Sequence, residues 1–402
     1  MKKLIAISVV FALVTAVAFA QPSVGGALGA RVVIVAGEST EDTPLLGGME
    51  FKNKHVNVDY ANSDGTAGGR VRLSGTSSEM GWWGALPFAF GWWKPIPQLR
   101  VQIGHNPDGD LGAPQISGWG MNAEAQDSVA IDQDSGDAGS TAARKARSPG
   151  WYGGYSEQGV LLSLYPAEGL TVNLVVPFGT GRSNNPNANV GEIYSKIHLN
   201  VVYSIPDIGV VRITFKGAGG LADNDDYPLP ASVGDIYASF FVTAVDNLAL
   251  DFGVSYGLPW DVEAAGVTTT TSPGLGIGVG ARFTSGDFGI KARVGAALGQ
   301  STKVGSADPV NGNTNIGIGI LPSFVLPAFT FYLNAGFGFS IPDADAASDF
   351  VVVDWFVNPY IRKSVSNFSF YAGFKLGTAG APDEDTDAVI KWSIPIGFNS
   401  YF

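Results

Sequence analysis

The sequence predicts an all-β fold, a membrane-spanning antiparallel up-and-down β-barrel of about 18 strands. Segments of roughly ten residues alternate between apolar and polar side chains, which is the period of a strand between two different surroundings. Short turns alternate with long polar loops along the chain. The chain is 45% hydrophobic and 15% charged, yet beyond its N-terminus it has no apolar run of roughly 18 or more residues, which a membrane-spanning helix requires.

The first twenty residues have the pattern of a secretory signal peptide. Two lysines precede an apolar run that ends in Ala18-Phe19-Ala20, a typical cleavage site. We therefore expect a signal peptide over 1–20 and a single barrel domain over 21–402. The absence of cysteine excludes disulfides and lipid attachment at a cleavage-site cysteine.

The N-terminal third contains six predicted strands. In one of them, 80–93, Trp82 and Trp92 share a face with Phe90. We expect this face to contact lipid, with the two tryptophans in the aromatic girdles and Trp93 on the opposite face. The six predicted strands span residues 26–36, 48–60, 68–76, 80–93, 97–105 and 156–165.

Twelve further strands follow from residue 170 onward. In 247–258, Leu250, Phe252 and Val254 share one face, and Asp251 and Ser255 share the other. The total of 18 is even, as bacterial single-chain barrels require, and 16 is the alternative because 48–60 and 68–76 are the least regular segments. Barrels of this size enclose an aqueous channel. The predicted long loops are 179–191, 220–232, 259–273, 300–312, 341–349 and 378–386.

The last predicted strand ends in alternating apolar residues, Ile394, Ile396 and Phe398, before the terminal Phe402. This ending resembles the C-terminal signal that the outer-membrane barrel assembly machinery reads. With the strand pattern, the chain resembles bacterial outer-membrane β-barrel proteins of the porin class, without pointing to one family. The resemblance implies an outer-membrane location, contact with outer-membrane lipid and with the assembly machinery, and a homotrimer as a candidate assembly.

The resemblance also implies a function, the passive diffusion of small hydrophilic solutes and ions through a water-filled barrel. Basic side chains fall on the polar faces of the strands, where they would set ion preference. Simple solvation of a polar interior is the alternative explanation. The predicted pore-lining residues are Arg31, Arg70, Arg72, Arg100, Lys196, His198, Arg212, Arg282, Lys291 and Arg293.

The segment 106–155 stands apart because loops of that length are usually functional or disordered. It follows the fifth strand and is therefore the third outward loop, which in general porins folds into the barrel and narrows it. We expect the same here, although a solvated outer loop would carry similar charges. The candidate constriction residues are Asp108, Asp110, Glu124, Asp127, Arg144, Lys145 and Arg147.

The chemistry of an enzyme is hard to find in this sequence. The three histidines are scattered, no Ser/His/Asp grouping is apparent, and no motif predicts a metal or cofactor. A net charge of −12 argues against nucleic acid as a partner. Two other functions fit the same fold: a channel selective for a sugar or a hydrophobic solute, and a non-transporting surface barrel or adhesin.

Overall fold

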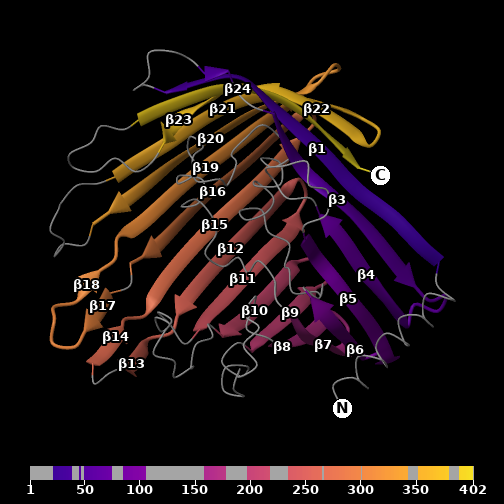
Figure 1. Cartoon of the computed structure of the whole chain (residues 1–402), viewed down its shortest axis with the longest axis vertical. Helices are drawn as coiled ribbons and strands as arrows, with labels where there is room; N and C mark the ends of the chain where they lie inside the picture. Colours follow the sequence, from indigo (N-terminus) through magenta and orange to yellow (C-terminus); the bar gives the residue numbers. More distant parts are fainter. Residues whose placement is uncertain are drawn as a thin grey trace.

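The structure is a computed structural model that describes residues 21–38, 45–46, 49–74, 85–105, 158–177, 197–217, 234–264, 267–299, 301–342, 352–379 and 389–401. Every regular element in these ranges is a β-strand (Figure 1). No helix in the described part of the chain is long and apolar enough to cross a membrane.

The main sheet joins antiparallel strands that follow one another in the chain, and its first strand also pairs with its last. This last pairing closes the sheet into a barrel. The strands are β1 (Gln21–Glu38), β3 (Met49–Ala61), β4 (Ala67–Ser74), β5 (Ala85–Ile96), β6 (Leu99–His105), β7 (Gln158–Ala167), β8 (Leu170–Pro177), β9 (His198–Ile205), β10 (Gly209–Gly217), β11 (Gly234–Val245), β12 (Leu248–Gly257), β15 (Gly274–Ser285), β16 (Phe288–Leu298), β19 (Thr314–Val325), β20 (Thr330–Ile341), β21 (Val352–Val365), β22 (Phe368–Gly373), β23 (Lys375–Ala379) and β24 (Val389–Tyr401).

The 20 elements of this sheet occupy 18 positions around the barrel. The short β2 (Leu45–Leu46) continues β3 along the same neighbour, β1. Likewise, β22 and β23 together form one interrupted strand between β21 and β24. The prediction of 18 strands is therefore confirmed for the described residues, and the alternative of 16 is wrong because 48–60 and 68–76 both form strands, β3 and β4.

Alternation sets which side chains face outward. In β12, Asp251 is 2% exposed, whereas its neighbour Phe252 is 43% exposed. The exposed row is apolar because it faces lipid, and the polar row lies inside. Large outward aromatic side chains gather near the short turns, as in the girdle of a membrane barrel: Trp93, Tyr203, Phe283, Phe288, Phe324, Phe331 and Phe370.

The expectation for the 80–93 segment is wrong in its orientation. Trp93 is 57% exposed on the outer surface, whereas Phe90 is 7% exposed and shares the inner face with Trp92. Both faces of this segment carry aromatic residues, so alternation alone does not distinguish them. The register does, because it places Trp92 opposite Gly68 and Gln102. Trp82 lies outside the described residues.

Two of the predicted loops, 259–273 and 300–312, instead contain a second sheet. Its strands are β13 (Trp260–Ala264), β14 (Val267–Thr271), β17 (Ser301–Val304) and β18 (Val310–Asn311). The pairing of β14 with β17 joins the two hairpins. The sequence Val-Thr-Thr-Thr-Thr of β14 explains this outcome, because β-branched residues favour extended backbone.

Candidate functional site

Most of the predicted pore-lining side chains project from the inner face of the barrel. Their neighbours along the strands, such as Val71, Ile103, Ile213 and Val294, are exposed on the outer face, which places the alternate residues inside. The inner-face residues from the prediction are Arg70 and Arg72 on β4, Arg100 on β6, His198 on β9, Arg212 on β10, Arg282 on β15, and Lys291 and Arg293 on β16.

Other predicted residues are not placed in this way. Arg31 lies in β1, where only its backbone is described. Ile394, Ile396 and Phe398 lie in β24. The signal peptide 1–20, Phe402, Lys196 and all seven constriction residues, Asp108, Asp110, Glu124, Asp127, Arg144, Lys145 and Arg147, lie outside the described residues.

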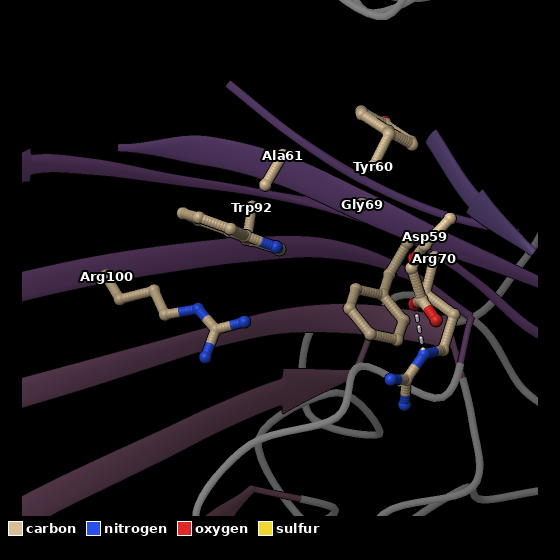
Figure 2. Close-up of a pocket in the computed structure, with 9 residues that line it drawn as sticks. Asp59, Tyr60, Ala61, Gly69, Arg70, Trp92 and Arg100 are labelled. Atoms are coloured by element: carbon tan, nitrogen blue, oxygen red, sulfur yellow. Dashed lines mark hydrogen bonds and ion pairs between the residues drawn. The ribbon is translucent and has the colours of Figure 1, made fainter. Parts of the chain in front are cut away.

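A recess of about 300 Å³ opens where β3 to β6 meet (Figure 2). Asp59 and Arg70 oppose each other in register, and Arg70 Nε donates to Asp59 Oδ1 over 2.5 Å. This ion pair lies at one end of the recess, and Arg100 lies at the other (Figure 2). The full lining is Ser23, Asp59, Tyr60, Ala61, Gly69, Arg70, Phe90, Trp92 and Arg100, and we call this cavity the Trp92 recess.

The indole of Trp92 holds two cations within the range of a cation–π interaction. Arg100 Cζ lies 4.8 Å from the ring centroid, and Lys94 Nζ lies 5.7 Å from it. The other neighbour of the ring is bare backbone, because a Cβ atom on Gly68 would lie 2.7 Å from Trp92 Cζ2. The recess therefore combines an aromatic wall with guanidinium and ammonium groups, and Asp59 is the single acid among its lining residues.

A row of polar side chains continues from the recess around the inner face. Arg100, Ser163, Asn173, Asn200 and Thr214 oppose one another on β6 to β10. Asn173 Nδ2 donates to Asn200 Oδ1 over 3.1 Å, and Asn200 Nδ2 donates to Thr214 Oγ1 over 2.6 Å. The last four of these side chains are buried. We call them, with Arg100, the polar row.

Sequence reasoning selected charged residues and passed over the neutral ones. Trp92 was assigned to the lipid face, and Gln102, Ser163 and the two asparagines were not singled out. The available signal was their parity, since each lies an even number of residues from a charged inner-face residue or from the strand partner of one. The sequence did not show which strands would be neighbours at which register.

No protein-family model and no curated protein matches this sequence. Several solved structures share its fold. The outer membrane channel DcaP of Acinetobacter baumannii superposes with a TM-score of 0.51 at 11% identity, covering 96% of this chain and 98% of that one. OccK11 (OpdR) of Pseudomonas aeruginosa gives 0.51 at 9% identity, covering 95% and 96%. OpdQ of the same organism gives 0.50 at 11% identity, covering 95% and 98%. The likeness extends over nearly the whole of each chain, so this chain has the barrel fold of these proteins.

Proposed function

We propose that this protein is an outer-membrane channel through which small hydrophilic solutes and ions diffuse passively. The observation that carries the proposal is the division between the two faces of the closed barrel. Charged and amide side chains line its inside, and apolar side chains cover its outside. A polar interior in an 18-strand barrel is what an aqueous pathway requires. The shared fold with DcaP, whose title names an outer membrane channel, supports the same function.

Conductance tests this proposal directly. The purified protein, inserted into a planar lipid bilayer in potassium chloride, is expected to give stable, ohmic single-channel steps. A protein that inserts, shown by protection of its strands from protease in vesicles, but gives no steps would overturn the proposal. Fractionation that leaves the protein outside the outer membrane would overturn the location.

We also propose that the segment 106–155 narrows the pathway. It connects β6 to β7, so both of its ends lie beside the Trp92 recess and the start of the polar row. Its acids Asp108, Asp110, Glu124 and Asp127 would then face the basic inner wall across the pore. Deleting residues 110–148 should raise single-channel conductance and change ion selectivity, and an unchanged conductance and selectivity would contradict a constriction.

Two partner proposals follow from the same resemblance. The alternate apolar residues Ile394, Ile396 and Phe398 with Phe402 would be read by the barrel assembly machinery, and deletion of Phe402 is expected to reduce the amount of folded barrel in the outer membrane. Assembly as a homotrimer is the second proposal, and the mass of the protein in mild detergent, measured by light scattering, tests it.

A surface-binding barrel is the second candidate function, and the sheet formed by β13, β14, β17 and β18 favours it. These hairpins extend two connections of the barrel into an ordered four-stranded platform. A channel does not need such a platform, whereas a binding surface does. Absence of conductance, together with loss of cell-surface adhesion when 260–271 and 301–311 are replaced by short turns, would favour this function over the channel.

A further inference from the structure

Two polar side chains beside the Trp92 recess are buried without hydrogen-bond partners. Gln102 is 0% exposed and Ser163 is 1% exposed. Among the residues that the structure describes, neither Nε2 nor Oε1 of Gln102 has a partner, and neither does Oγ of Ser163. Leaving such groups unpaired in a buried position is unfavourable by about 1–3 kcal/mol each. A bound solute would provide the missing partners.

The unpaired atoms lie on neighbouring strands and form one array. Gln102 opposes Trp92 on β5, and Ser163 opposes both Arg100 on β6 and Asn173 on β8. In the same part of the described structure, Nε of Arg100 and Oδ1 of Asn173 are buried and also lack a hydrogen-bond partner. Adjacent strands lie about 5 Å apart, so a molecule of about six carbons would reach several of these groups at once.

The array contains donors and acceptors together. Nε2 of Gln102 and Nε of Arg100 donate, Oε1 of Gln102 and Oδ1 of Asn173 accept, and the hydroxyl of Ser163 does both. A simple carboxylate satisfies only the donors, because it carries no hydrogen to offer. A hydroxyl group satisfies either kind, so the ligand must carry hydroxyl groups.

The charges of the recess add a second requirement. Arg100 and Lys94 both lie within 6 Å of the Trp92 ring centroid, and the one acidic lining residue, Asp59, is already paired with Arg70. The positive charge near Trp92 therefore has no acidic neighbour among the lining residues. An anionic group on the ligand would supply the opposite charge.

We propose that Gln102, Ser163, Arg100 and Asn173 form a binding site on the inner wall for a small hydroxylated organic anion, such as an aldonate or a hydroxy acid. The proposal rests on the proposed function, since such a solute would meet this wall while crossing the barrel. Its carboxylate lies toward Arg100 and Lys94, and its hydroxyl groups bond Gln102, Ser163 and Asn173.

Three probes of equal carbon number separate the two requirements. Gluconate has both a carboxylate and hydroxyl groups, hexanoate has only the carboxylate, and sorbitol has only the hydroxyl groups. Binding to the purified protein in detergent is measured by isothermal titration calorimetry, which does not depend on conduction. Gluconate is expected to bind about tenfold more tightly than either other probe, because each good hydrogen bond or charge contact contributes about 1 kcal/mol.

Two substitutions and a matched control locate the site. Gln102→Leu keeps the approximate size of the side chain and removes its donor and acceptor, and it should weaken gluconate binding about tenfold. Ser163→Ala should weaken it severalfold. Ser239→Ala is the control, because Ser239 is also a buried serine of the inner face but lies on β11, away from the array. It should leave gluconate binding unchanged.

The outcomes distinguish this inference from the channel function. Equal affinity for gluconate, hexanoate and sorbitol, or no measurable binding of gluconate, would overturn the site while leaving any measured conductance in potassium chloride intact. Gluconate binding that is unaffected by both Gln102→Leu and Ser163→Ala would place the site elsewhere and equally overturn it. Conversely, selective binding by a protein that gives no conductance would retain the site and reject the channel.

Discussion

At the scale of single residues, the contact between Trp92 and Gly68 shows why small and large residues occur together in this barrel wall. The indole lies over the glycine, so an added Cβ would approach within 2.7 Å of the ring and 2.4 Å of the Tyr60 carbonyl oxygen. Neither neighbour can move freely, since one is backbone and the other is held by cations. The glycine is thus part of the construction of the recess.

Gly68→Ala should therefore destabilise the folded barrel, by about 1–3 kcal/mol, which is the usual effect of overpacking. Urea unfolding in lipid vesicles, followed by tryptophan fluorescence, measures the change. Gly91→Ala is the matched control on the adjacent strand, because its added Cβ would meet nothing nearer than 3.7 Å. Equal stability losses in the two variants would contradict the packing described here.

The ion pair between Asp59 and Arg70 leads to a second prediction at this scale. The pair is about one-third exposed, so its loss should change stability by no more than about 1 kcal/mol. Its effect on permeation should be larger, because it leaves Arg70 as an uncompensated charge in the recess. Asp59→Asn is expected to shift the reversal potential in a potassium chloride gradient toward anion preference.

A turn residue provides the control for this measurement. Asp64 lies in the connection between β3 and β4, where it accepts hydrogen bonds from the backbone and hydroxyl of Thr66, and these bonds lower the pKa of its carboxyl. Asp64→Asn removes the same charge away from the recess and should leave the reversal potential unchanged. An equal shift from both substitutions would mean that the recess has no particular influence on the ions.

At the scale of the strand, the alternation of faces has a direct energetic consequence. Phe252 points outward from the middle of β12, whereas Ser255, three residues along, belongs to the inner row with Asp251. Phe252→Lys would bring an ammonium group into the hydrocarbon region, which is unfavourable by about 2–4 kcal/mol near the bilayer midplane. Ser255→Lys would add the same charge to the polar interior.

We expect the first variant to lose stability by that amount and the second to lose less than about 1 kcal/mol, as for most polar surface changes. Reversible unfolding in vesicles measures both. Because the two lysines lie on the same strand, differences in strand propensity largely cancel. Similar losses in the two variants would contradict the assignment of the outer face to lipid.

Strand interruptions are also visible at this scale. The break at Phe374 divides one barrel strand into β22 and β23, and the backbone N–H of Phe374 instead donates to the Pro359 carbonyl over 3.0 Å. Pro359 lies opposite on β21 and has no N–H to offer the ladder. The local pattern of two short strands therefore reflects a single ladder position that proline disrupts.

At the scale of the whole molecule, the pairing of β1 with β24 closes the barrel and leaves neither strand with a free edge. Leu28 and Ser400 oppose each other in this pairing. The Cα atoms of opposed residues in an antiparallel pair lie about 4.5–5.5 Å apart, which is within reach of a disulfide. Since the chain has no native cysteine, a pair of introduced cysteines can be followed without interference.

Leu28→Cys with Ser400→Cys should form an intramolecular disulfide on mild oxidation, detected as a linked peptide by mass spectrometry. The control pair is Leu28→Cys with Ser393→Cys, because Ser393 pairs with Ala36 and lies roughly seven residues, or about 23 Å, farther along the strand. It should not cross-link. Cross-linking of the control alone would require a different register, and no cross-link in either would argue for an open sheet.

The sequence by itself determined the period, number and outer face of most strands, because alternation is local and lipid accepts only apolar side chains. It identified 18 strands, including the irregular β3 and β4, and it placed Arg70, Arg100, His198 and Arg293 on inner faces. Only the tertiary structure decided which residues oppose one another across strands. The orientation of β5, the pairing of β14 with β17 and the array around Gln102 all depend on register and closure. These are set jointly by distant segments, so no single segment contains the information.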